Sequence, residues 1–158
     1  MRNSLQIDPE RCTGCRSCEL ACSLKKAGEF NPARSRVRQV AFLEEALCFP
    51  LACLQCEEPS CAKVCPSRAL SRDEELGTVS IREEACIGCR MCTLACPFGL
   101  VGFSPEGKAE KCDLCGGEPE CVAFCPSGAL QFQGASQGRL ARMVSLSQQL
   151  KEAYPGMK

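Results

Sequence analysis

The sequence of 158 residues contains no histidine and no tryptophan, and aromatic side chains make up only 5% of it. Without histidine, the chain cannot form zinc sites with mixed cysteine and histidine ligands, Rieske centres or histidine-ligated haem. It also lacks the side chain that most often serves as a general base in catalysis. Because aromatic residues are so few, an ordinary core built on large rings is not expected.

Several signals of particular partners or locations are also missing. The formal net charge is zero, with 19 basic and 19 acidic residues, so the composition does not favour nucleic acid. No run of about 18 apolar residues predicts a membrane span. Residues 1–8 contain no apolar segment typical of a secretion signal, so we expect a cytoplasmic protein. The sequence has no G-x-G-x-x-G fingerprint and no P-loop, so we expect no catalytic activity of its own.

Cysteine is the residue that the sequence has in excess, with 17 copies. Such a share indicates a disulfide scaffold, a zinc protein or an iron–sulfur protein. An odd number of cysteines cannot pair completely, and cytosolic thiols are kept reduced. Both points disfavour the disulfide scaffold and leave the two metal classes.

Four groups contain all but one of the 17 cysteines, and every group ends in the spacing x3-C. Group three, at residues 86–97, has the pattern C-x2-C-x2-C-x3-C-P that holds 4Fe–4S clusters in bacterial ferredoxins. In that pattern the first three cysteines ligate one cluster, and the fourth ligates its neighbour. The repeat therefore predicts four 4Fe–4S clusters as cofactors. The four groups are Cys12, Cys15, Cys18 and Cys22; Cys53, Cys56, Cys61 and Cys65; Cys86, Cys89, Cys92 and Cys96; and Cys112, Cys115, Cys121 and Cys125.

Zinc is the alternative for groups two and four, where residues 57–60 and 116–120 widen the second gap. Pairs of the form C-x2-C are normal in zinc ribbons, but a zinc site has no need of a third cysteine three residues further on. Groups one and three have that third cysteine, which favours clusters throughout the repeat. Cys48 lies outside the groups, and we expect it to be a small buried side chain rather than a ligand.

Short strands are predicted beside the groups, at residues 5–8, 69–70, 78–81 and 129–132. The strand at residues 69–70 can fold back on the strand at residues 78–81, as in the hairpin that joins the halves of a two-cluster ferredoxin. Groups two and three then form an inner unit, while groups one and four form an outer unit in which the first strand pairs with the last. The predicted fold class is α+β, with two nested ferredoxin-like units and a C-terminal helix. A tandem arrangement, group one with two and group three with four, is the alternative.

The nested arrangement predicts how the chain is divided and which cysteines share a cluster. The segments are 1–30 and 105–133 for the outer unit, 31–52 for an insert strand and connector, 53–104 for the inner unit, and 134–158 for a C-terminal linker and helix that docks on a partner or on this chain. The clusters are A (Cys12, Cys15, Cys18, Cys125), B (Cys112, Cys115, Cys121, Cys22), C (Cys53, Cys56, Cys61, Cys96) and D (Cys86, Cys89, Cys92, Cys65).

Other residues around the ligands also carry expectations. Gly14 and Gly88 each precede the second cysteine of a group, where glycine permits a close backbone approach. In residues 31–40, arginine alternates with other side chains towards the end, which predicts a half-exposed strand. Its basic side faces solvent, a partner or the clusters. Apolar residues between the ligands are expected to exclude water from the clusters; they are Leu20, Val64, Ile87, Leu94, Val122 and Phe124.

Residues 5–132 resemble the four-cluster ferredoxin-like electron-transfer subunits of multi-subunit oxidoreductases. The resemblance implies the same nested pairing and four clusters. Residues 1–45 look most like the small iron–sulfur subunit of tungsten aldehyde oxidoreductases. The motifs that carry the resemblance are Cys12-Thr-Gly-Cys15-Arg-Ser-Cys18-Glu-Leu-Ala-Cys22, Asn31-Pro-Ala-Arg-Ser-Arg36, Cys56-Glu-Glu-Pro-Ser-Cys61, Cys96-Pro-Phe-Gly99 and Lys108-Ala-Glu-Lys111-Cys112-Asp-Leu-Cys115.

The resemblance implies an electron conduit within a hetero-oligomer. A catalytic subunit with a tungsten or molybdenum pterin is expected at one end, and a flavin or NAD subunit or a soluble ferredoxin at the other. Similar subunits serve carbon monoxide dehydrogenases, hydrogenases, formate dehydrogenases, molybdopterin reductases of the dimethyl sulfoxide type and benzoyl-coenzyme A reductases, which are alternatives for the catalytic partner. A free-standing polyferredoxin carrier and a zinc-binding interaction module are alternatives of other kinds.

Overall fold

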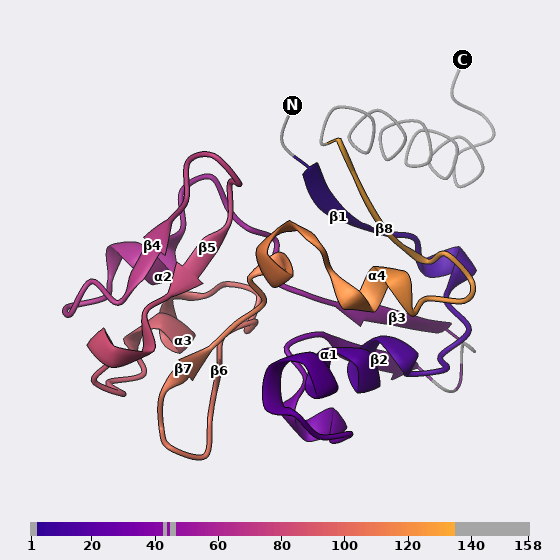
Figure 1. Ribbon diagram of the computed structural model, residues 1–158, viewed down its shortest axis with the longest axis horizontal. Helices are drawn as coiled ribbons and strands as arrows, with labels where there is room; N and C mark the ends of the chain where they lie inside the picture. The colour runs from indigo at the N-terminus through magenta and orange to yellow at the C-terminus, as the bar shows by residue number, and fades with distance from the viewer. Residues whose placement is uncertain (1–2, 43, 45–46, 135–158) are drawn as a thin grey trace.

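The computed structural model of the chain describes residues 3–42, 44 and 47–134 (Figure 1). The helix predicted near the C-terminus, with all of its linker after Gly134, lies outside the described residues. Within the described part, no helix has both the length and the apolar character needed to cross a bilayer.

The described chain is built from short helices and short strands, in agreement with a mixed class of small ferredoxin-like fold. Its strands form two-stranded antiparallel sheets, four of them in the described part. With η marking a 3₁₀ helix, the elements are β1 (Asn3–Ile7), η1 (Pro9–Arg11), α1 (Ser17–Ala27), η2 (Pro32–Arg34), β2 (Arg38–Phe42), β3 (Leu47–Leu51), α2 (Ser60–Lys63), β4 (Leu70–Arg72), β5 (Val79–Ile81), η3 (Glu83–Ala85), α3 (Met91–Ala95), β6 (Gly102–Phe103), β7 (Ala109–Glu110), η4 (Leu114–Gly117), α4 (Glu120–Ala123) and β8 (Leu130–Gly134).

Both predicted strand pairs are confirmed. β1 pairs with β8, with Leu5 opposite Phe132, so the two ends of the described chain lie side by side. β4 pairs with β5, with Leu70 opposite Ile81, and forms the hairpin expected between groups two and three. The two pairs therefore hold together the segments that flank the cysteine groups.

The other two sheets go beyond the sequence-based expectation. The strand expected at the end of residues 31–40 is present, but it begins only at Arg38 and pairs with β3, where Val40 lies opposite Phe49. β3 contains the buried Pro50, which cannot donate to a strand ladder and is tolerated because this ribbon has only two strands. β6 and β7 form the shortest pair, with Gly102 opposite Glu110.

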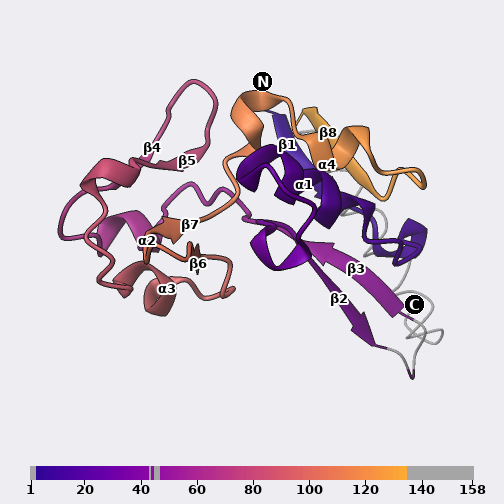
Figure 2. The ribbon, with the colours of Figure 1, turned by 60° about the horizontal axis from the view of Figure 1, so that its bottom comes forward.

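Two cores divide these elements. Figures 1 and 2 show β4 to β7 with α2 and α3 gathered on one side, and the elements from both ends of the chain on the other. Because Val37 and Ala52 pack into the second core, the predicted insert is part of that core and does not stand apart. The first core consists of Ala69, Leu70, Val79, Cys86, Cys92, Val101 and Ala109, and the second of Cys22, Val37, Ala52, Cys121 and Leu130.

The helix α1, which begins within group one, is longer than the α-helices that begin within the other groups. A proline follows the last cysteine of each other group, but Cys22 is followed by Ser23, so nothing stops α1 at this point. The buried hydroxyl of Ser23 donates to Leu20 O at 3.0 Å and accepts from the Asn31 N–H at 3.1 Å. The helix then ends at Gly28, in a left-handed conformation with a φ of +73°.

The close approach predicted at Gly88 can be tested by substitution. Gly88 has a φ of +70°, and a Cβ there would lie 2.8 Å from the carbonyl oxygen of Gly107. Since that oxygen belongs to the backbone, it cannot swing away. We expect Gly88→Ala to lower the free energy of unfolding by about 2–3 kcal/mol, as measured by chemical denaturation.

Gly99→Ala is the matched control for this substitution. Gly99 also has a positive φ, +63°, but a Cβ there would meet nothing within 4 Å. Only the conformational cost, about 1 kcal/mol, is expected. Equal losses in the two variants would show that the contact with Gly107 has no influence.

Candidate iron–sulfur sites

The four cysteine groups share one backbone conformation. The residue before the second cysteine has a positive φ in every group: Gly14 (+70°), Gln55 (+51°), Gly88 (+70°) and Leu114 (+55°). Glycine adopts this conformation freely, whereas other residues do so at a cost of about 1–2 kcal/mol. In groups two and four a residue other than glycine adopts this conformation. The first halves of these groups therefore form the same loop as in groups one and three, although the gap between their second and third cysteines is wider.

Group one meets the last cysteine of group four. The four side chains predicted for cluster A line one pocket together, beside Pro50 and Leu130. Pro50 comes from β3 and Leu130 from β8, so the hairpin of the insert and the outer strand pair both close this pocket. The cysteines brought together are Cys12, Cys15, Cys18 and Cys125.

Group four in turn meets the last cysteine of group one. α1 packs on α4, which places Cys22 near Cys121. Burial, followed by the charges of Cys112 and Cys22 and then Cys115, raises the pKa of the Cys121 thiol. Burial and the charges of Cys53 and Cys22 likewise raise the pKa of Cys112 to about 11. The four cysteines predicted for cluster B are therefore neighbours, and Cys53 lies close to them.

In the inner groups, too, the last cysteine of one group lies near the other group. Burial raises the pKa of Cys61, and the charges of Cys53 and Cys96 add to that rise, so the last cysteine of group three lies beside group two. Burial and the charges of Cys86 and Cys89 raise the pKa of Cys92. The remaining two cysteines are Cys65, which packs against the core that contains Cys86 and Cys92, and Cys56, whose carbonyl oxygen accepts from Arg72 Nη1.

These surroundings fit thiolates that are bound to metal. Burial raises the pKa of Cys18 to about 11, as it does for Cys112, so both thiols keep their protons when no metal compensates the charge. A bound cation reverses this preference and deprotonates the sulfur. Among the described residues, no three Cys, Asp or Glu side chains gather closely enough to hold a single ion. A 4Fe–4S cluster offers four irons, so its ligands need not converge on one point.

Backbone N–H groups point at several of the sulfurs. Leu100 and Ala69, each four residues after the last cysteine of a group, donate to Cys96 at 3.4 Å and to Cys65 at 3.3 Å. Cys22 has no following proline turn, and Arg36 donates to it instead at 3.3 Å. Hydrogen bonds to sulfur are one determinant of a cluster's reduction potential.

The expectation that the apolar residues between the ligands exclude water is wrong for most of them. Leu94 is 81% exposed and Ile87 is 66% exposed, on either side of the exposed Cys89. Leu20, Val64 and Phe124 are exposed as well, and Val122 is half-buried. Cys15, in group one, is the other exposed cysteine in the described part of the chain. Groups one and three therefore each reach the surface at their second cysteine.

Cys48 differs from the predicted buried position. It is half-buried on β3, and its Sγ lies 3.1 Å from the place that a Cβ on Gly14 would take. Its neighbour is therefore the backbone of the group-one loop. That contact leaves little room for a side chain at position 14 and gives Cys48 a packing role.

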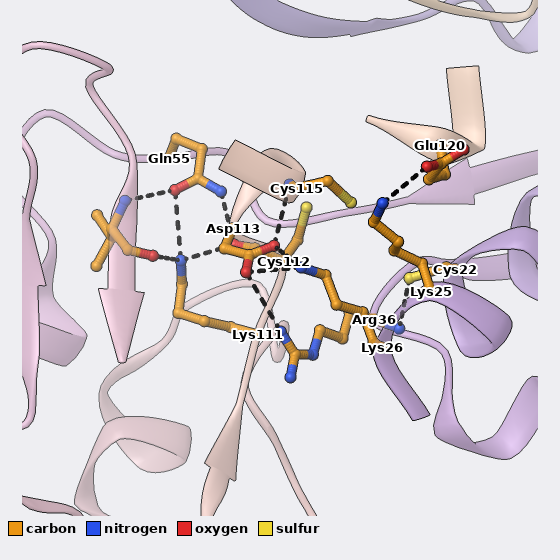
Figure 3. Close-up of polar contacts among 11 residues, drawn as sticks. Cys22, Lys25, Lys26, Arg36, Gln55, Lys111, Cys112, Asp113, Cys115 and Glu120 are labelled. Carbon is orange, nitrogen blue, oxygen red and sulfur yellow. Dashed lines mark hydrogen bonds and ion pairs between the residues drawn. The ribbon is translucent and has the colours of Figure 1, made fainter. Parts of the chain in front are cut away.

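A chain of ion pairs ties α1 to group four (Figure 3). Lys25 pairs with Glu120 at 3.0 Å, and Lys26 pairs with Asp113 at 2.8 Å. Arg36 approaches the same carboxylate at 3.5 Å. Burial opposes ionisation of Asp113, but the hydrogen bond and charge of Lys26 outweigh it and lower the pKa of that carboxyl. These contacts keep Cys22 beside group four.

The family descriptions that match this chain agree with the geometry of the cysteines. A 4Fe-4S dicluster domain matches residues 44–135, and a 4Fe-4S binding domain matches residues 5–23. The chain belongs to the 4Fe-4S dicluster domain family. This membership confirms the predicted class of cofactor, the 4Fe–4S cluster.

Relatives of this chain are named as subunits of oxidoreductases. The chain is 47% identical, over 121 residues, to the polyferredoxin-like subunit of an aliphatic sulfonate oxidoreductase from Pyrococcus furiosus, covering 75% of this chain and 69% of the relative. It is 38% identical, over 148 residues, to a probable anaerobic dimethyl sulfoxide reductase chain, YnfG, of Escherichia coli K12, covering 80% and 70%. A solved chain of the BamBC complex of benzoyl coenzyme A reductase is 27% identical, covers 92% and 90%, and has a TM-score of 0.47.

The prediction of a non-catalytic electron-transfer subunit agrees with the names of these relatives. The finer prediction of a tungsten aldehyde oxidoreductase partner is not confirmed by them. Two residues of this chain carry contacts that the sequence did not predict, Gln55 and Lys111. The available signals were the position of Gln55, which matches Gly14 and Gly88, and the place of Lys111 directly before Cys112.

Proposed function

We propose that this iron–sulfur electron-transfer subunit relays electrons through four 4Fe–4S clusters in the order A, B, C and D. The observation that carries the proposal is the proximity of groups two and four: Gln55, between Cys53 and Cys56, donates to Cys112 O at 2.7 Å, and after burial the charge of Cys53 raises the pKa of the Cys112 thiol. The Cys18 charge likewise acts on Cys121, after those of the cysteines in its own set. Each proposed cluster therefore has a neighbour on the way through the chain.

The nested assignment of ligands is part of this proposal. It is supported by the strand pairs β1–β8 and β4–β5, which join group one to group four and group two to group three. The pocket that contains Cys125 and the proximity of Cys22 to Cys121 support an exchange of fourth ligands within the outer unit. The effect of Cys96 on Cys61 supports the same exchange within the inner unit.

The two ends of the proposed path are the places where electrons enter and leave. Cys15 of cluster A and Cys89 of cluster D are the exposed cysteines in the described part of the chain. Ile87 and Leu94 beside Cys89 expose large apolar side chains, which favours contact with a protein partner at that end. A free-standing carrier would be expected to keep such a face more polar.

The proposed partner is a catalytic oxidoreductase subunit with a tungsten or molybdenum pterin, and a flavin or NAD subunit or a ferredoxin is proposed at the other end. The resemblance of residues 1–45 supports an aldehyde oxidoreductase. The named relatives support other oxidoreductases, which act on an aliphatic sulfonate or on dimethyl sulfoxide. Co-purification of the catalytic subunit distinguishes these cases, and gel filtration of a cell extract distinguishes a complex from a free carrier.

Metal analysis tests the proposal most directly. The anaerobically purified chain is expected to be brown, with broad visible absorption and about sixteen iron and sixteen acid-labile sulfide atoms. About eight of each would support only one unit with clusters. A colourless protein that contains zinc in place of iron would contradict the proposal and favour the zinc-binding interaction module.

A further inference from the structure

A buried lysine lies between the two cores. Lys111 is only 3% exposed. Its Nζ donates to Val79 O at 2.5 Å, to Cys112 O at 3.0 Å and to Gln55 Oε1 at 3.3 Å (Figure 3). Three acceptors match the three N–H donors of an ammonium group. The side chain is therefore held as a fixed positive charge inside the protein.

This charge has no carboxylate partner within residues 3–42, 44 and 47–134, where the ion pairs involve other lysines and arginines. A buried charge is costly unless an opposite charge compensates it, and hydrogen bonds to neutral oxygens supply none. A cysteine sulfur, that of Cys61, is a group on which the charge of Lys111 acts. Burial raises the pKa of the Cys61 thiol, and the positive charge of Lys111 opposes that rise.

Gln55 fixes the lysine in this position. It belongs to the group-two loop, and its Oε1 also accepts from the Val79 N–H at 2.8 Å. Its Nε2 donates to Cys112 O at 2.7 Å, the same oxygen that Lys111 contacts. Gln55 and Lys111 therefore connect the loop of group two to the start of group four. This is where the proposed path crosses from cluster B to cluster C.

We propose that Lys111 raises the electron affinity of cluster C by stabilising the negative charge that this cluster gains on reduction. The inference rests on the four-cluster function proposed above. The step is the arrival of one electron, with no bond made or broken and no proton moved. A fixed positive charge in surroundings of low dielectric constant favours the more negative, reduced form. Lys111 is thus a tuning residue, and it keeps an electron that has crossed between the two units from returning at once.

Lys111→Met tests this inference on the full chain loaded with clusters. The variant removes the charge and keeps a long, flexible side chain in the cavity. In a potentiometric titration followed by electron paramagnetic resonance, we expect one reduction step to become at least about tenfold less favourable, which is 59 mV for one electron. The steps assigned to clusters A and D are expected to stay in place and serve as internal references.

Lys63→Met is the matched control. Lys63 lies two residues after Cys61, but its side chain is 61% exposed and pairs with Glu58 at 2.6 Å. Removal of this screened surface charge is expected to change the equilibrium constant of every reduction step by less than about twofold. A shift as large as that of Lys111→Met would show that any nearby lysine has the same effect, and it would overturn the specific role.

Two further measurements keep the outcome decisive. Lys111→Gln removes the charge but keeps a donor for Cys112 O, and the same shift is expected. Reduction potentials that stay unchanged in both variants would overturn the proposal. Loss of iron from both variants would also overturn it, because Lys111 would then have a purely structural role. The iron content of the unchanged chain separates the proposed function from this inference. If that chain holds fewer than about sixteen irons, the four-cluster function itself fails. If it holds all of them and the variants keep its reduction potentials, only the inference about Lys111 is contradicted.

Discussion

Replacing Cys22 and Cys112 together by serine is expected to remove no more iron than replacing either one alone. The nested assignment places both residues on cluster B, and the structure brings both near Cys121. Each single variant should therefore lose or convert the same cluster, up to about four of about sixteen irons, and the double variant should lose nothing further. Iron and acid-labile sulfide per chain, measured after anaerobic purification, give the comparison.

The tandem arrangement makes the opposite prediction. It would assign Cys22 to the cluster of group two and Cys112 to that of group four, so the double variant would lose about twice as much iron as each single variant. That result would overturn the nesting and leave the presence of clusters intact. Cys48→Ser is the control, because Cys48 packs on the group-one loop and lies outside the predicted ligands. Its iron content should stay near that of the unchanged chain.

Glu19→Ala is expected to lower the melting temperature by about 4–10 °C, which corresponds to about 2–3 kcal/mol of stability. Glu19 is 2% exposed and lies in the first turn of α1. Its Oε1 accepts from the Gln39 N–H at 2.9 Å, and its Oε2 accepts from Arg16 Nε at 2.6 Å. The substitution leaves the Gln39 N–H without its acceptor and removes the tie between α1 and β2. Thermal unfolding of the cluster-loaded chain, followed by circular dichroism, measures the loss.

Glu58→Ala is the matched control, since Glu58 also pairs at 2.6 Å, with Lys63, but its side chain is 82% exposed. Exposed pairs contribute little because water and salt screen them, so little change in melting temperature is expected. Glu19→Gln keeps the acceptor oxygen and the shape, and it should recover part of the stability. If Glu19→Ala and Glu58→Ala melt at the same temperature, the buried carboxylate does not join the helix to the strand.

The strand pairs were predictable because the cysteine repeat limited where strands could lie along the sequence. The β4–β5 hairpin and the β1–β8 pair follow from β-branched and apolar residues just outside the groups. β3 was not predictable, because Pro50 argues against a strand when the partner strand is unknown. The length of α1 was not predictable for a related reason. Ser23 occupies the position where the other groups have a proline that stops the helix, and it does not indicate where α1 ends.

At the sites, spacing indicated where the candidate ligands lie along the sequence, but not which other side chains are buried with them. A charged residue is normally expected at the surface, so Glu19 and Lys111 gave no signal of their burial. Both are buried because partners distant in sequence supply their hydrogen bonds. Leu94 is the reverse case, an apolar residue of α3 that is exposed although its neighbour Cys92 is buried.

The pairing of β1 with β8 also has a consequence for the order in which the protein matures. The ribosome makes Leu5 long before its partner Phe132, because most of the described chain lies between them. The strands β4 and β5 are close together in sequence and can meet while translation continues. The β4–β5 hairpin can therefore form before β8 is made, whereas β1 has to wait for β8. A message truncated before β8 would yield a chain in which β1 has no partner strand.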